Sequence, residues 1–135
     1  MITQVEFSLS AQTRGFHLVT DEVLANIESL PETGIFTLFI QHTSAGLTIN
    51  ENADATVRTD FESSFNHIVK ENEPFYKHTY EGSDDMPAHI KAAMMPVSLS
   101  IPVLQGKLAL GTWQGIYLFE HRNAAHTRKV VLHLA

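Results

Sequence analysis

The sequence contains no cysteine among its 135 residues. This absence excludes disulfide bonds and thiolate metal sites, and it is compatible with a reducing cytoplasm. A metal site in this chain would have to use histidine, aspartate, glutamate and water, which suit zinc and also harder divalent ions. Eight histidines supply many imidazole groups for such a site.

Long apolar runs are also missing. No run approaches the roughly 18 residues that a membrane-spanning helix requires. The N-terminal residues 1–7 lack the basic segment and the long apolar segment of a signal peptide. We therefore expect a cytoplasmic protein with no membrane partner.

Basic residues are few and scattered. Nine lysines and arginines stand against fifteen aspartates and glutamates, so the formal net charge is -6, and Arg128-Lys129 is the only adjacent basic pair. A nucleic-acid-binding surface usually shows a clustered basic patch, so no nucleic-acid partner is expected. Nucleophile elbows, phosphate-binding glycine loops and dinucleotide fingerprints are absent as well.

What the sequence does contain is a succession of short apolar segments typical of one α+β domain over residues 1–135. The alternation of apolar and polar residues, and apolar residues at helical spacing, predict about seven strands and three helices in a largely antiparallel sheet. The main predicted strands are 2–9, 35–40, 97–103, 108–120 and 129–134, and the predicted helices are 21–27 capped by Thr20, a helix that follows Asn50, and 86–95.

A polar stretch, residues 41–60, follows the strand 35–40. Its first part, up to Asn50, is expected to form a polar loop, and the second helix is expected to begin after Asn50. Asn50 is a plausible N-cap of that helix, which would place Glu51 and Asp54 in its first turn. His42 with Glu51 or Asp54 could form an acid–base pair, so these three are the candidate catalytic residues. The alternative is that Asn50, Glu51 and Asp54 only cap and solvate the start of the helix.

A second polar segment, residues 71–85, lacks apolar periodicity and is long for a loop in a compact domain. Asp85 and His89 are four residues apart, so they share one face of the following helix. Together with His78 they offer two imidazoles and a carboxylate, a sensible ligand set for a divalent ion. The alternative is a helix cap beside a solvated face.

The single tryptophan, Trp113, lies between Thr112 and Gln114, and these three residues are flanked by two glycines. A tryptophan flanked by hydrogen-bonding side chains could stack on a flat ring, although tryptophan is more often part of a core.

Three blocks of sequence together resemble the YjbQ family, UPF0047. They are HTSAGLTINENAD at 42–54, GSDDMPAHIK at 82–91 and LALGTWQGI at 108–116. The resemblance covers nearly the whole chain. It implies a compact α+β sandwich that assembles as a homotrimer, with the site near the subunit interfaces.

The resemblance also implies a small-molecule substrate and secondary thiamine-phosphate synthase activity. That reaction joins a hydroxymethylpyrimidine diphosphate to a thiazole phosphate and releases pyrophosphate. A divalent metal, zinc or magnesium, is associated with a histidine-rich pocket, which we assign to His78, Asp85 and His89. The expected substrate-binding residues are a stacking Trp113 and the hydrogen-bonding side chains of Ser44, Asn50, Thr112 and Gln114.

The charge of the chain bears on this reaction. Only Arg58 and Lys91 are basic near these blocks, so a diphosphate would need the ion or a neighbouring subunit to supply positive charge. Two alternatives need less positive charge. One is metal-dependent hydrolysis of a small substrate with His42 or Glu51 as base, and the other is a non-catalytic small-ligand-binding protein.

Overall fold

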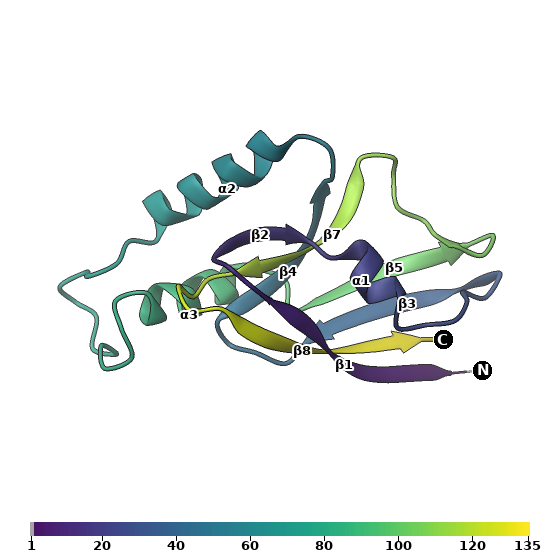
Figure 1. Ribbon diagram of the computed structural model, residues 1–135, viewed down its shortest axis with the longest axis horizontal. Coiled ribbons are helices and arrows are strands. Elements are labelled where there is room, and N and C mark those ends of the chain that lie inside the picture. Colours follow the sequence, from purple (N-terminus) through teal and green to yellow (C-terminus); the bar gives the residue numbers. More distant parts are fainter. Residues whose placement is uncertain (1) are drawn as a thin grey trace.

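Alternating apolar and polar side chains build two antiparallel sheets, which a computed structural model describes for residues 2–135 (Figure 1). The larger sheet has the order β1-β8-β3-β5-β6 and the smaller one the order β2-β7-β4. The strands are β1 Thr3–Gln12, β2 Gly15–Leu18, β3 Thr33–Ile40, β4 Ala45–Glu51, β5 Ser98–Leu104, β6 Lys107–Leu108, β7 Gln114–Glu120 and β8 His126–Leu134. The predicted α+β sandwich with three helices is confirmed.

The main core lies between the two sheets. Phe36 and Leu38 of β3 and Leu132 of β8 face Leu47 of β4 and Leu118 of β7, and all five are fully buried. Each such side chain contributes about 1.5–3 kcal/mol by leaving water. This layer fixes which side chains of β3, β4, β7 and β8 turn toward the main core.

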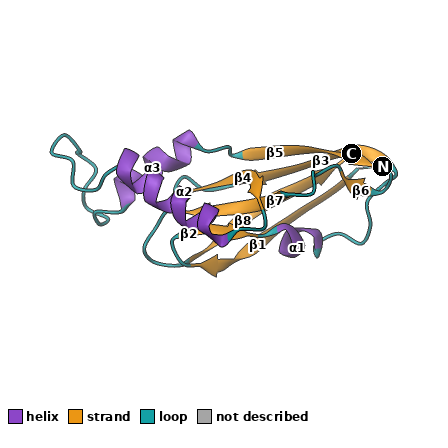
Figure 2. Cartoon of the chain, turned by 90° about the horizontal axis from the view of Figure 1, so that it is seen from above, coloured by secondary structure: helices purple, strands orange, loops and turns teal. Residues whose placement is uncertain are grey.

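The central strand of the smaller sheet, β7, is buried on both faces. Tyr117 and Phe119 point away from the main core and form a second cluster with Phe16 of β2. Helix α2, Ala55–Ile68, covers this cluster with Phe61 and Phe65, and the rings of Phe65 and Phe119 are 5.0 Å apart. Helices therefore form a third layer on the smaller sheet, and Figure 2 shows α2 and α3 together at one end of the strands.

Helix α3, Asp85–Met94, packs closely against β4. A Cβ atom on Gly46 would lie 2.6 Å from the Cβ atom of Met95, a separation that real side chains do not tolerate. Glycine at this position lets the end of α3 approach the strand. The short helix α1, Thr20–Leu24, buries Val23 against the main core.

The prediction that residues 41–50 form a polar loop was wrong, because most of that stretch is strand β4. Ala45 and Leu47 enter the core, and Asn50 pairs with Gly115 of β7. Asn50 is therefore not a helix cap, and Glu51 is not in a helical turn. The N-cap of α2 is Asp54, whose Oδ1 accepts a hydrogen bond of 2.9 Å from the Thr56 amide.

Two other boundaries differ from the prediction. The expected strand 108–120 is divided into β6 and β7 by residues 109–113. Thr20 does not cap α1, since its hydroxyl accepts a 2.9 Å hydrogen bond from the Ile116 amide of β7. In residues 2–135, none of the helices has the length and apolar character needed to cross a bilayer.

One ion pair is buried at the end of the sandwich. Glu120 of β7 and Arg128 of β8 belong to different sheets, and their side chains are 0% and 4% exposed. The Glu120 Oε1 atom also accepts hydrogen bonds from the amides of His121 and Arg122, at 3.0 and 3.1 Å. Arg128 Nη2 donates to the Ser44 carbonyl at 3.3 Å. The pair thus connects β7, β8 and the start of β4.

Arg128→Met should lower the free energy of unfolding by about 3–5 kcal/mol, because it leaves the Glu120 charge buried without a partner. The double variant Arg128→Met with Glu120→Gln should recover a large part of this loss, since glutamine still accepts from the two amides. Chemical denaturation of the single and double variants measures both values. If the double variant loses as much unfolding free energy as the two single variants together, Glu120 and Arg128 do not stabilise the fold as a pair.

His121 is also buried, with 1% exposure, and neither ring nitrogen has a partner among the described residues. Burial, together with the nearby charges of Lys91, Arg128 and Arg14, lowers the pKa of His121 to about 3. The unfolded chain takes up a proton near pH 6.5, whereas the folded chain does not. Stability is therefore complete above pH 6.5 and falls as the pH drops toward 3.

We expect this histidine to cost about 2 kcal/mol of folding free energy at pH 5, from a slope of about 1.4 kcal/mol per pH unit. Urea unfolding in EDTA between pH 7 and 5 measures the slope. His121→Leu should reduce the slope by the contribution of one proton, about 1.4 kcal/mol per pH unit. His67→Gln, which removes an exposed imidazole from α2, is the control. An unchanged slope in His121→Leu would show that His121 is protonated in the folded chain.

Candidate metal centre

The loop between α2 and α3 and the first two turns of α3 bring two imidazoles onto one carboxylate. Asp85 is the first residue of α3, His89 lies one turn later, and His78 comes from the loop. The Asp85 Oδ2 atom is 2.6 Å from His78 Nε2 and 3.1 Å from His89 Nε2. Three potential ligand atoms, one from each residue, lie within 4.8 Å of one another. The structure thus brings together the three residues that the sequence suggested as metal ligands.

The hydrogen bonds of His89 fix the position of its proton. Its Nδ1 atom lies 2.9 Å from the Thr43 carbonyl oxygen, which can only accept, so Nδ1 carries the proton. In the neutral ring, Nε2 then presents a lone pair to the Asp85 carboxylate. Two acceptors facing each other at 3.1 Å require a cation between them or a proton on Nε2. A backbone carbonyl on the second nitrogen is the usual support of a metal-binding histidine.

His78 is the accessible member of the three. Its side chain is 46% exposed, whereas that of Asp85 is 2% exposed. The rings of His78 and His89 meet edge to face with centroids 5.4 Å apart. The carboxylate is thus shielded from solvent, whereas the imidazole of His78 is not.

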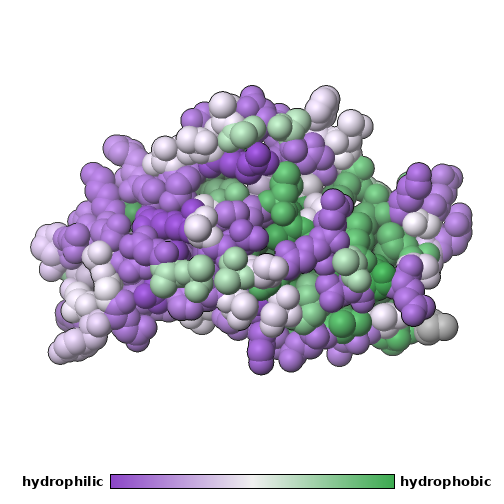
Figure 3. All heavy atoms as spheres, in the orientation of Figure 1, coloured by the Kyte–Doolittle hydropathy of each residue, from purple (hydrophilic) through white to green (hydrophobic). Residues whose placement is uncertain are grey.

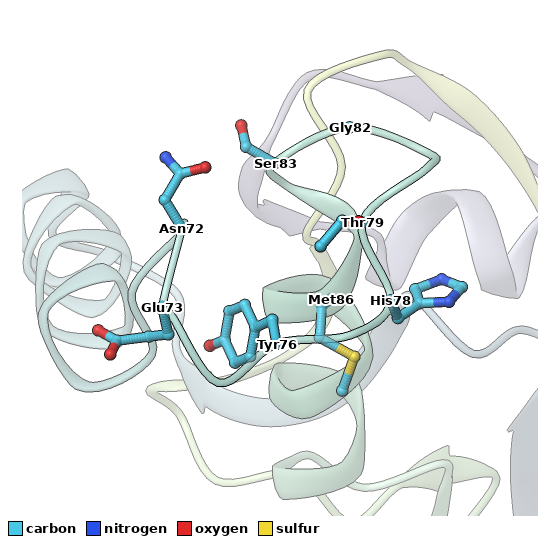
Figure 4. Close-up of a pocket in the computed structure, with 8 residues that line it drawn as sticks. All are labelled: Asn72, Glu73, Tyr76, His78, Thr79, Gly82, Ser83 and Met86. Carbon is cyan, nitrogen blue, oxygen red and sulfur yellow. The ribbon is translucent and has the colours of Figure 1, made fainter.

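A pocket of about 280 Å³ adjoins His78 between the loop and the start of α3 (Figure 4). Tyr76 and Met86 are among its lining residues, and the ring of His78 projects away from both. The imidazole therefore turns toward Asp85 rather than into this pocket.

Arg122 is the residue of this site that the sequence reasoning missed. Its Nη1 donates to Asp85 Oδ1 at 2.6 Å and its Nε to Asp84 Oδ2 at 2.9 Å, while Nη2 donates to the Glu81 carbonyl at 3.1 Å. Arg122 follows the buried strand β7. Its position among polar residues directly after a buried strand was the only signal in the sequence that could have identified it. It holds the carboxylate of Asp85 so that Oδ2 faces the two histidines.

The electrostatics keep Asp85 ionised. Burial by itself raises the pKa of Asp85, but the hydrogen bond from His78, the charge that His89 carries whenever its ring is protonated, and the charge of Arg122 together hold the pKa below its usual value. The pKa of Asp84 is lowered in the same way, against its burial, by hydrogen bonds from Asn123 and Arg122. The site therefore offers a negatively charged oxygen ligand at neutral pH.

These residues fit a divalent ion. Two imidazoles and one carboxylate leave coordination positions open, which is the pattern of catalytic rather than structural zinc sites. Imidazole nitrogen favours zinc over magnesium, which prefers oxygen ligands and retains water. Of the two metals considered from the sequence, the donor set suits zinc better.

The loop that carries His78 is anchored by a second polar cluster. Arg14 contacts Glu62, Asn66 and Asn123, and Glu71 accepts from the Ser83 hydroxyl at 2.6 Å. Lys91, which the sequence placed near the site as a positive charge, is 1% exposed, and its Nζ donates to Asn66 at 2.6 Å. Its ammonium group therefore stabilises the packing of α3 on α2.

The proposed acid–base pair is not formed within one chain. His42 precedes β4 and lines a pocket with His89, whereas Glu51 is the last residue of β4. The six steps of that strand separate its ends by about 20 Å. Asp54 is fully exposed and caps α2. The chemical roles of these three residues stay predictions, but they do not act as one cluster in this chain.

Three of the predicted substrate-binding residues do share a pocket. Asn50, Trp113 and Gln114 line a space of about 320 Å³ with Glu51 and Ile49, and Trp113 is 64% exposed. The other two are not among the residues that line this pocket. Ser44 is buried beside Arg128, and the Thr112 carbonyl accepts from Asn52 at 3.2 Å.

Comparison with known proteins gives a consistent result. The family model described as UPF0047 protein YjbQ-like matches residues 5–135. UPF0047 protein YjbQ of Salmonella typhimurium is 52% identical over 130 residues, which cover 95% of this chain and 94% of the relative. A UPF0047 protein of Synechocystis is 43% identical over 94% of this chain and 87% of its own length.

Solved structures agree. A conserved hypothetical protein from Thermus thermophilus superimposes with a TM-score of 0.81 at 32% identity, covering 94% of this chain and 97% of its own. A YbjQ-like protein of Sulfolobus solfataricus has a TM-score of 0.82 at 22% identity, covering 99% and 96%, which supports the fold alone. With a family match from residue 5 to residue 135 and relatives similar over most of their length, the chain belongs to the YjbQ (UPF0047) family.

Proposed function

We propose that this protein is a divalent-metal-dependent enzyme whose ion is held by His78, Asp85 and His89. The observation that carries the proposal is the hydrogen bond from His89 Nδ1 to the Thr43 carbonyl. It turns the lone pair of Nε2 toward the Asp85 carboxylate, where a cation satisfies both groups.

The chain's own residues divide the work at this site. Thr43 orients His89, and Arg122 orients Asp85 through its other oxygen atom. His78, on the loop, closes the ligand set from the solvent side. When bound, the ion would supply Lewis-acid chemistry, by polarising a substrate oxygen and neutralising a leaving anion.

The leading reaction is the one that the family resemblance implies, thiamine-phosphate synthesis. A thiazole ring nitrogen displaces diphosphate from the methylene carbon of the pyrimidine, so a C–O bond breaks, a C–N bond forms and pyrophosphate leaves. The pocket of Asn50, Trp113 and Gln114 supports recognition of a heteroaromatic ring, because it combines an exposed indole with amide groups.

Hydrolysis of a small substrate is the second candidate, and the bonding of Arg122 favours it. All three side-chain nitrogens of Arg122 already have acceptors, and Lys91 is buried. Arg122 and Lys91 are thus occupied or buried, whereas a diphosphate needs positive charge around it. Water needs no such partner. Binding of a small ligand without turnover is the remaining alternative.

Assembly as a homotrimer is part of the proposal. Strands β3 and β5 expose large apolar side chains, namely Ile35, Phe39 and Leu104, and Val97 is exposed just before β5. Apolar exposure of this kind marks an association surface. Figure 3 shows apolar atoms reaching the surface over the strands, while the helical end is mostly hydrophilic. A cytoplasmic location also stays a proposal.

Purified protein should bind close to one zinc ion per chain, and His89→Ala and Asp85→Asn should lose it, because each removes a ligand. Arg122→Gln should weaken zinc binding about 10–100-fold, as removal of a supporting group does. Isothermal titration calorimetry and elemental analysis measure these values. Size-exclusion chromatography checks that each variant keeps its assembly.

His67→Gln is the matched control, because it removes one exposed histidine that is outside the group of candidate ligands and should leave zinc binding unchanged. Wild-type protein that takes up no divalent ion, or His89→Ala protein that binds zinc as tightly as wild type, would refute the metal centre.

The reaction is tested by incubating zinc-loaded protein with hydroxymethylpyrimidine diphosphate, with and without thiazole phosphate. Synthase activity should yield thiamine phosphate and pyrophosphate only when both are present. Asp85→Asn should lower the rate by at least about tenfold, whereas His67→Gln should not. Pyrophosphate released without thiazole phosphate would instead indicate hydrolysis, and binding with no product would support the ligand-binding alternative.

A further inference from the structure

Another pocket, of about 280 Å³, is lined by His89 but by neither of the other two candidate ligands. Its remaining walls are His42 and Thr43 from the loop before β4, Ala92 and Ala93 from α3, and Val97 before β5. Ala92, Ala93 and Val97 give it a mainly apolar floor. Because it shares His89 with the candidate metal centre, a molecule in this pocket lies directly beside that centre.

The hydrogen bond of His42 fixes its chemical role. The Lys129 backbone amide lies 2.7 Å from His42 Nε2. A backbone amide can only donate, so Nε2 is the acceptor, and the neutral ring carries its proton on Nδ1. The lone pair that a general base would need is already used. His42 is therefore left with a single function toward a ligand, donation from Nδ1.

The surroundings of His42 keep it neutral and favour an anionic partner. Burial, followed by the charge of Arg128, lowers the pKa of His42. The charge of Glu120 opposes this, and the smaller effects of His126 and Lys129 add to the lowering. Lys129 and His126 are exposed. The ligand atom that meets His42 is thus in a neighbourhood with more basic than acidic groups.

We propose that this pocket is a substrate subsite for a small planar group that carries an anionic oxygen, and that His42 donates its Nδ1–H to that oxygen. The planar part packs on Ala92, Ala93 and Val97. The inference rests on the proposed function for its role in a reaction, but neither the pocket nor the proton position depends on a metal ion. It also replaces the expectation that His42 acts as the base.

The proton position is measured by long-range ¹H–¹⁵N correlation spectroscopy on ¹⁵N-labelled protein in EDTA. His42 should show a protonated Nδ1 and an unprotonated Nε2, unchanged from pH 8 to pH 6. Resonances of a doubly protonated ring near pH 6.5, or of a ring protonated on Nε2, would overturn the assignment of His42 as a fixed donor.

The subsite is tested with three probes that separate its two requirements. Benzoate has a flat ring and an anionic oxygen, acetate lacks the ring, and benzyl alcohol lacks the charge. In amide NMR titrations of metal-free protein, benzoate should bind at least about tenfold more tightly than either, and should shift the resonances of Thr43, Ala92 and Ala93. Equal binding of the three probes, or shifts confined to other pockets, would refute the subsite.

Three variants distinguish donation from shape. His42→Gln keeps an acceptor for the Lys129 amide and an N–H donor, so benzoate affinity should stay within about threefold. His42→Phe keeps a ring but cannot donate, so affinity should fall about tenfold or more. Ala93→Leu should block the pocket. A His42→Phe protein that binds benzoate as wild type does would eliminate the donor role.

Adding zinc to the same samples separates this inference from the metal proposal. Loss of zinc binding in His89→Ala with an unchanged His42 ring supports both. Benzoate binding in a protein that never takes up zinc would leave the subsite intact and remove the metal centre.

Discussion

The ion pair of Glu120 and Arg128 positions both sides of the site. Glu120 accepts from the amides of His121 and Arg122 and so fixes the turn after β7, from which Arg122 reaches Asp84 and Asp85. Arg128 holds the Ser44 carbonyl, next to the Thr43 carbonyl that orients His89. One buried contact between the two sheets therefore controls the carboxylate from one direction and a histidine from the other.

Such a pair is an expensive way to gain stability. Removing two charges from water costs several kcal/mol per ion, and a well-packed apolar pair of the same volume is often as stable. Here the ion pair fixes the orientation of the groups around it, because one carboxylate accepts hydrogen bonds from a guanidinium and two backbone amides at once. Apolar packing would hold the sheets together equally well, but it would not specify where Arg122 points. Fixed hydrogen-bond directions recur at Asp85, His89 and His42, which indicates that this end of the sandwich is built for geometry.

Local patterns predicted the elements well and the contacts between them poorly. Alternation located β1 and β5, and a short apolar run located β3. The spacing of Asp85 and His89 placed them on one helix face, because such patterns follow from the repeat of a single element. Strand β4 was missed because Gly46, Thr48 and Asn50 gave its outer side a loop-like composition, although Ala45 and Leu47 turn inward. Arg122 could not be assigned to Asp85 from the sequence, since their meeting depends on how β7 and α3 pack. The same holds for the amide of Lys129, whose bond to His42 decides that histidine's tautomer.

The length of β4 limits what a single chain can do with its two sets of recognition residues. His42 and the histidine-rich centre lie at one end of the strand, and Asn50, Glu51 and Trp113 at the other, about 20 Å away. A pyrimidine or a thiazole ring is only a few ångströms wide, so one substrate cannot touch both ends of the same chain. If both sets act on one reaction, the indole and the metal centre must come from different copies. If they do not, the pocket lined by His42 and His89 is sufficient to hold a small substrate beside the metal ligands, and Trp113 serves another contact. How the chain assembles therefore decides whether Trp113 and the metal centre can act on the same substrate.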